Sequence, residues 1–143
     1  MSFLFRSTPR QRDLALLALR VILGVIFIAH GQQKLFGMGF TGVQGAFGKM
    51  GAPFPEITGP LIALLEFFGG IALVVGLLTR LVTAGFVADM LGAILLVHLP
   101  KGLIGPGGYE LVLSLLGASL ALFLAGAGDF SLDGLIGRRR AYH

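Results

Sequence analysis

The chain has 143 residues, of which 55% are hydrophobic and only 13% are charged, and its mean hydropathy is +0.90. Soluble domains carry about one quarter charged residues, so this composition indicates an integral membrane protein. Cysteine is absent, which excludes disulfides, thiolate metal ligands and thiol redox chemistry. The net charge of +4 does not indicate nucleic-acid binding, because the cations stand at the ends of apolar stretches, where they would meet anionic lipid headgroups.

Four apolar stretches are each long enough to cross a bilayer, at about residues 14–34, 58–78, 80–99 and 109–127. A helix needs roughly 20 residues to cross about 30 Å of hydrocarbon. The sequence therefore predicts an all-α fold, an integral membrane four-helix bundle that forms a single transmembrane domain over residues 1–143. The first stretch is too long for a signal peptide and lacks a small-x-small cleavage site, so we expect it to remain as a helix.

The first span carries three ionisable side chains through an otherwise apolar run. On a helix that turns about 100° per residue, Arg20, His30 and Lys34 share an arc of roughly 120° with small residues. We expect this polar face to look into the bundle. In the fourth span, one stripe is similarly polar and small: Glu110, Ser114, Gly117 and Ala121.

A glycine-rich segment separates the first two spans. Val43, Phe47 and Met50 recur there at i, i+4 and i+7, and Pro53 and Pro55 follow. This pattern predicts a short interfacial helix that covers the outer mouth of the bundle. An apolar connector lying on the lipid surface is the open alternative.

Three side chains are predicted to cap helix N-termini. They are Asp13 before the first span, Thr41 before the interfacial helix, and Thr58 before the second span.

The distribution of basic residues predicts the orientation of the spans. One side collects Lys34, Lys49 and Lys101, and the other side collects Arg6, Arg10, Arg12, Arg80, Arg138, Arg139 and Arg140. Short cytoplasmic segments are enriched in Lys and Arg, so the side with seven arginines is predicted to be cytoplasmic. Both termini lie on that side.

Ionisable residues within the spans should be paired, since an unpaired charge at the bilayer centre costs about 2.5–3.5 kcal/mol or more. At 1.5 Å per residue, Arg20 lies about 9 Å, Asp89 about 13 Å and Glu66 about 18 Å above the cytoplasmic boundary. We therefore predict a structural ion pair between Arg20 and Asp89, with Glu66 as the alternative partner of Arg20. At roughly 24–30 Å, an outer polar network is predicted from four residues: His30, Lys34, His98 and Glu110.

Several short motifs make the chain resemble the DoxX family of small four-helix bacterial membrane proteins. They are Arg20, the H-G-x-x-K of His30–Lys34, the E-x-x-G-G of Glu66–Gly70, the G-L-x-T-R of Gly76–Arg80, His98, Glu110 and the G-x-G-x-F-S-L-D of Gly126–Asp133. Asp89 departs from the family pattern, in which we expect an uncharged residue. The resemblance implies a multi-pass protein of the bacterial cytoplasmic (inner) membrane.

The resemblance also implies a redox role, because some relatives are described as subunits of quinone-linked oxidoreductases and others as membrane partners of redox enzymes. We therefore expect a membrane subunit that binds a quinone or a similar lipid-soluble compound and supports a redox protein partner. Candidate ligand-binding or proton-relay residues are His30, Lys34, Glu66, His98 and Glu110. The chain alone would not be a complete oxidoreductase, since it has no haem-attachment motif and no dinucleotide-binding loop.

Other functions remain open at this point. The polar residues could be purely structural in a non-enzymatic scaffold, or the protein could bind or transport a small molecule without chemistry. Haem ligation by His30 and His98 is disfavoured, and Lys34 argues against a metal site because it would repel the cation. A second copy of the chain is a candidate partner.

Overall fold

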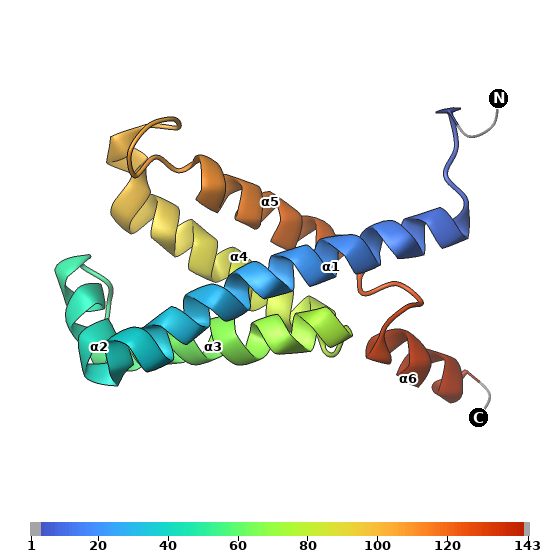
Figure 1. Ribbon diagram of the computed structural model, residues 1–143, viewed down its shortest axis with the longest axis horizontal. Coiled ribbons are helices and arrows are strands. Elements are labelled where there is room, and N and C mark those ends of the chain that lie inside the picture. Colours follow the sequence, from blue (N-terminus) through green and yellow to red (C-terminus); the bar gives the residue numbers. More distant parts are fainter. Residues whose placement is uncertain (1–3, 142–143) are drawn as a thin grey trace.

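The computed structural model describes residues 4–141, and within this range the protein is helical without strands. The α-helices of these residues, labelled in Figure 1, are α1 (Pro9–Gln32), α2 (Gly39–Lys49), α3 (Pro55–Val75), α4 (Thr79–Ala93), α5 (Glu110–Ala125) and α6 (Leu132–Arg140). Two π-helical segments, η2 (Gln33–Met38) and η3 (Ile94–His98), extend α1 and α4, and a 3-10 turn, η4 (Leu99–Lys101), follows η3.

Three helical runs are long and apolar enough to cross a membrane: Pro9–Lys49, Pro55–Val75 and Thr79–Lys101. The fourth predicted span, α5, is a shorter apolar helix of 16 residues. These elements confirm the predicted all-α membrane bundle, with a helix, α2, between the first and second spans.

The bundle consists of two helix pairs. Helix α1 packs along α3, and α4 packs along α5, and the two pairs diverge toward the end at which α2 lies (Figure 1). Where the pairs meet, Phe27 of α1 stacks on Phe86 of α4 with ring centroids 3.7 Å apart. The core continues through Leu23, Leu73 and Leu122, which are at most 2% exposed.

Glycines allow α1 and α3 to approach closely. A Cβ added at Gly31 would lie 2.3 Å from the backbone nitrogen of Phe67, and one at Gly70 would lie 2.8 Å from the carbonyl oxygen of Gly24. Any side chain at either position would force the backbones apart. Close approach through small residues is how helices associate in lipid, where burial from water contributes little.

Helices α1, α2 and α3 begin before the residues that were predicted to cap them. Helix α1 starts at Pro9, and its N-cap is Thr8, whose hydroxyl accepts a hydrogen bond from the Gln11 backbone N–H at 3.2 Å. The predictions for Asp13, Thr41 and Thr58 are wrong, because all three lie inside helices.

Pro60 lies inside α3 and has no N–H to donate to the carbonyl of Glu56 one turn earlier. The side-chain amide of Gln44 in α2 donates to this carbonyl instead, at 3.2 Å. The proline therefore leaves an acceptor free, and this acceptor fastens α2 to the start of α3.

Arg20 is fully buried, and its guanidinium binds backbone carbonyls. Nη1 donates to Leu73 at 3.2 Å and to Val74 at 3.1 Å, both in the last turn of α3. Nε donates to Ala127 at 3.0 Å, and Nη2 donates to Phe130. Arg20 thus caps the C-terminus of α3 and fixes the loop between α5 and α6.

The predicted ion pair between Arg20 and Asp89 is wrong. The Arg20 guanidinium instead donates hydrogen bonds to backbone carbonyls, among them those at the end of α3. Carbonyls at the C-terminus of a helix carry partial negative charge and have no partner within the helix. The salt bridges among residues 4–141 are those of Lys34 with Glu66 and of Arg138 with Asp129.

The segment from Gly126 to Asp133, which comprises the loop after α5 and the start of α6, contacts the turn between α3 and α4. Both carboxylate oxygens of Asp133 accept 2.8 Å bonds from the first backbone N–H groups of α4, those of Leu78 and Thr79. The Gly76–Arg80 and Gly126–Asp133 motifs therefore meet in one structural joint.

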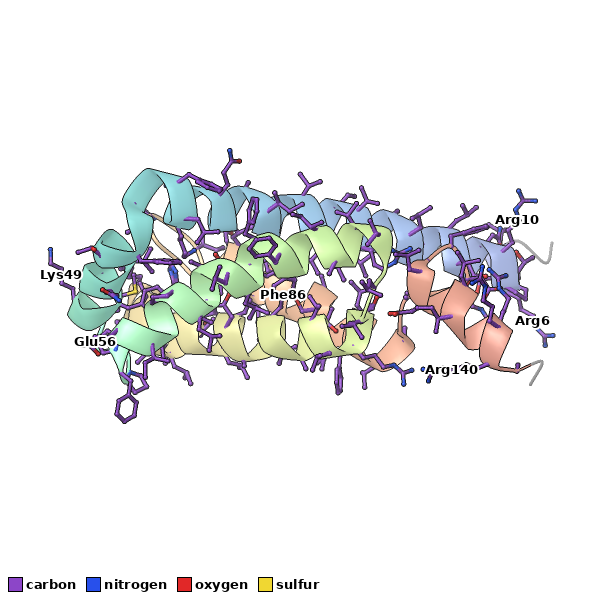
Figure 2. The ribbon with its side chains drawn as sticks, turned by 90° about the horizontal axis from the view of Figure 1, so that it is seen from below. Arg6, Arg10, Lys49, Glu56, Phe86 and Arg140 are labelled. Carbon is purple, nitrogen blue, oxygen red and sulfur yellow. The ribbon has the colours of Figure 1, made fainter. Side chains whose placement is uncertain are left out.

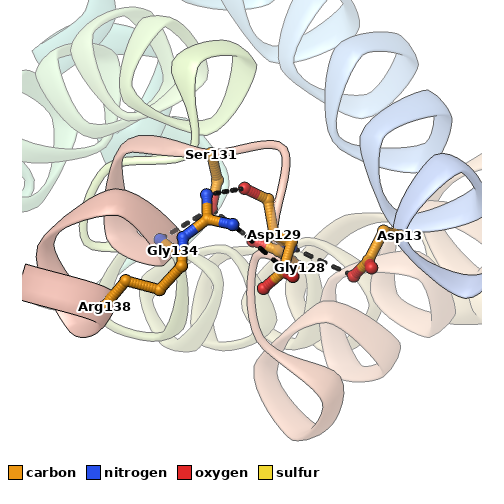
Figure 3. A network of polar contacts seen from close by, with 6 residues as sticks. All are labelled: Asp13, Gly128, Asp129, Ser131, Gly134 and Arg138. Atoms are coloured by element: carbon orange, nitrogen blue, oxygen red, sulfur yellow. Dashed lines mark hydrogen bonds and ion pairs between the residues drawn. The ribbon is translucent and has the colours of Figure 1, made fainter. Parts of the chain in front are cut away.

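A network at the same end ties both terminal regions together (Figure 3). The Asp129 backbone N–H donates to the Asp13 carboxylate at 3.0 Å, and Arg138 of α6 contacts the Asp129 carboxylate at 3.7 Å. Ser131 caps α6 by accepting from the Gly134 N–H at 2.9 Å. The last span predicted from the sequence ends near residue 127, so α6 is an additional helix.

Candidate functional site

A cavity of about 450 Å³ lies between the two helix pairs, and its lining includes Phe47 of α2. Most of its lining is apolar, and Phe27, Met90 and Leu115 of the buried core are part of it. Five of its lining residues are ionisable: His30, Lys34, Glu66, Asp89 and His98. The cavity is thus an apolar chamber with a few convergent polar groups, as small-molecule sites are.

The strongest polar contact in the cavity joins Lys34 to Glu66. Lys34 Nζ donates to Glu66 Oε2 at 2.6 Å, and the two side chains are 21% and 4% exposed. Glu66 projects from the middle of α3, whereas Lys34 lies in η2. The depth estimate separated these residues because it ignored the long apolar stem of lysine, which carries the ammonium far from its backbone position.

Asp89 of α4 lines the same cavity and not the inner half of the bundle. Its Oδ2 atom is buried and accepts no hydrogen bond from the part of the chain that the structure describes. An enclosed carboxylate oxygen without a donor is costly, so this atom marks the place at which the site is incomplete.

The two candidate histidines also line the cavity, but they differ in their surroundings. His98 is half-buried, and its Nδ1 lies 2.7 Å from the carbonyl oxygen of Gly107. Since a carbonyl only accepts, Nδ1 carries the hydrogen and Nε2 of the neutral ring remains an acceptor. His30 is exposed at the cavity rim.

The structure does not bring Glu110 into the site. Glu110 is exposed at the start of α5 and is not among the residues that line the cavity. The rest of its stripe, Ser114, Gly117 and Ala121, is exposed as well. The predicted outer network therefore lacks Glu110, and the cavity holds Glu66 and Asp89 instead.

Both π-helical segments supply lining residues: Lys34 comes from η2, and Leu96, Val97 and His98 come from η3. Such segments are rare and occur frequently at functional sites. Helical periodicity alone does not reveal them. The one signal after η3 is Pro100, whose missing N–H leaves a carbonyl of the preceding turn free and permits a different hydrogen-bond pattern.

Comparisons with known proteins agree with this architecture. The DoxX family model matches residues 15–99. The chain is 36% identical over 121 residues to "Putative oxidoreductase CatD" of Bacillus subtilis, covering 85% of this chain and 86% of that protein. It is 33% identical over 137 residues to "Inner membrane protein YqjF" of Escherichia coli, covering 91% of this chain and 98% of that protein.

A third relative is "Uncharacterized membrane protein Rv3486" of Mycobacterium tuberculosis, 29% identical over 136 residues, covering 87% of this chain and 83% of that protein. No solved structure matches the chain at a significant level.

Proposed function

Because this chain belongs to the DoxX family of membrane proteins, we propose that its cavity binds the headgroup of a quinone or a similar lipid-soluble compound on behalf of a redox partner protein. The observation that carries this proposal is the Lys34–Glu66 ion pair, which stands beside Asp89 in the wall of a largely apolar cavity. A relative that bears the name of an oxidoreductase supports a redox setting.

The energetic cost of these residues favours a ligand site over simple helix adhesion. Polar contacts between membrane helices contribute on average only about 0.6 kcal/mol, whereas a charge in the membrane interior costs several times more. Arg20 shows how this chain satisfies a structural charge, with every donor group near a carbonyl and dense packing around it. Lys34, Glu66 and Asp89 instead adjoin open volume, which is what a ligand requires.

The residues suit the chemistry of a quinone headgroup. Its carbonyl oxygens accept hydrogen bonds, which the Lys34 ammonium donates, and its apolar ring fits between Phe27 and the apolar lining of α4 and α5. Reduction of a quinone to a quinol adds two electrons and two protons. The electrons come from the partner protein, and the carboxyl groups of Glu66 and Asp89 are the proton carriers next to the ligand.

Quinone binding is tested on protein purified in a mild detergent and reconstituted in nanodiscs. We expect ubiquinone or menaquinone to copurify and to be found by extraction and mass spectrometry, and a soluble short-chain quinone to bind in a titration. Glu66→Gln should weaken binding about ten-fold, because it removes the carboxylate to which Lys34 donates and which fixes the position of the ammonium.

Glu110→Gln is the matched control, since it changes the same chemical group on an exposed surface outside the cavity. Wild-type protein that neither retains nor binds a quinone would overturn the proposal. The redox partner is sought separately, by a mild-detergent pull-down from the native membrane with identification of copurifying proteins.

A further inference from the structure

The charges that surround the cavity do not balance. Five helical segments each contribute one ionisable residue to the lining: His30 from α1, Lys34 from η2, Glu66 from α3, Asp89 from α4 and His98 from η3. The parts of α2 and α5 that line the cavity contribute only apolar side chains. Apart from the two histidines, two carboxylates face a single ammonium.

The contacts show where the imbalance is located. Lys34 donates to Glu66 at 2.6 Å and not to Asp89. Glu66 from α3 and Asp89 from α4 line the same cavity, and Asp89 Oδ2 is buried with no donor among residues 4–141. Two carboxylates in the wall of one largely apolar cavity repel each other unless a hydrogen or a cation lies between them.

We infer that Glu66 and Asp89 share one proton, so that Lys34, Glu66 and Asp89 form a neutral trio that stores a transferable proton in the cavity wall. A single hydrogen between the carboxyl groups supplies the donor that Asp89 Oδ2 lacks and cancels the excess negative charge at once. Asp89, which departs from the expected uncharged residue, is the group that turns the Lys34–Glu66 ion pair into a proton store.

The use of this proton in quinone reduction rests on the proposed function, whereas the shared proton itself does not. In that use, the carboxyl O–H bond breaks and an O–H bond forms on the ligand oxygen as the partner protein supplies an electron. The trio is then left with one negative charge until it takes up a proton from the cavity mouth, where exposed His30 lies. A second cycle completes the two-electron, two-proton reduction.

Infrared difference spectroscopy of ligand-free protein in nanodiscs tests the inference. Near neutral pH, wild-type protein should show the C=O stretching band of a protonated carboxyl group, shifted in D₂O. Asp89→Asn and Glu66→Gln should each abolish this band, because one remaining carboxylate is balanced by Lys34. Lys34→Met should roughly double its intensity, because both carboxyl groups then need a proton.

Glu110→Gln should leave the band unchanged, and size-exclusion profiles and helical circular dichroism check that each variant is folded. A wild-type spectrum without the band would overturn the inference before any variant is made. A band that survives in both Asp89→Asn and Glu66→Gln would also overturn it. Since no quinone is present in these samples, either result is independent of whether the cavity binds one.

Discussion

Arg20 is the one large charged side chain that is completely enclosed among residues 4–141, and it is held by carbonyl groups from α3 and from the loop after α5. Helix-end carbonyls have no partner within their helix, so a guanidinium with five donors in a fixed fork suits them well. Gly76 makes this possible, because a Cβ there would lie 2.5 Å from Arg20 Nη1. Arg20 therefore stabilises the fold, and it does not line the cavity.

Replacing Arg20 by methionine should lower the free energy of unfolding by about 3 kcal/mol, because several buried carbonyls lose their donor. Reversible unfolding in mixed detergent micelles measures this loss. Arg20→Lys should not restore stability, since one ammonium cannot reach all of these acceptors.

Arg80→Met is the matched control for Arg20. Arg80 is exposed and makes a single 3.3 Å contact with the Leu124 carbonyl, so its loss should cost less than about 1 kcal/mol. Equal losses for the two arginines would contradict the structural role of Arg20.

Residue pairing was the least predictable feature of the sequence. The ionisable residues could be recognised as special because hydrocarbon penalises them, and all but Glu110 of the candidate ligand residues line the cavity. Their partners could not be assigned, because backbone carbonyls leave no mark in a sequence. Lys34 also reaches farther than its helical position suggests.

At the scale of elements, the contact between α1 and α3 depends on glycine. Gly31→Ala should lower the free energy of unfolding by about 1–3 kcal/mol, because the new methyl group would overlap the Phe67 backbone. Gly117→Ala on α5 is the control, since a Cβ there meets nothing within 4 Å. Similar losses for both variants in the same unfolding assay would argue against close packing of α1 on α3.

The junction of α2 and α3 gives a second prediction at this scale. Gln44→Ala should cost about 1 kcal/mol, because the Glu56 carbonyl loses its donor. In a Pro60→Ala background the same change should cost almost nothing, since the alanine has a backbone N–H of its own to donate to Glu56. A double-mutant cycle measures the coupling, and additive effects would contradict the proposed compensation.

Hydropathy and length predicted the existence of the spanning helices well, because an apolar run of spanning length has few alternatives in lipid. The ends of the helices were less predictable. The short helix α6 and the π-helical segments η2 and η3 were not predicted, since none of them has a periodic apolar pattern that differs from its surroundings.

At the scale of the whole molecule, the two ends differ in charge and in chemistry. Figure 2 shows Arg6, Arg10 and Arg140 at one end and Lys49 with Glu56 at the other. The first end holds the joint of Arg20 and Asp133, whereas the second end holds the cavity. The protein thus separates an end held by buried polar contacts from an end that contains the cavity.

The orientation of this axis in the membrane is a prediction. A fluorescent protein fused to the C-terminus should fluoresce, and alkaline phosphatase fused there should be inactive, because an arginine-rich end remains in the cytoplasm. Fusions placed in the loop between η4 and α5 should show the reverse behaviour. Active phosphatase at the C-terminus would invert the assignment and would place the cavity on the cytoplasmic side.

The central claim is that the cavity between the two helix pairs is where a quinone binds, and photoaffinity labelling with an azidoquinone tests it most directly. After illumination in nanodiscs, peptide mapping should place the label on cavity-lining segments, within residues 47–53 and 88–98. An excess of unmodified quinone should prevent labelling, and Glu66→Gln should weaken it while Glu110→Gln does not. Labelling that resists competition, or that falls only on the lipid-facing side of α5, would contradict the account.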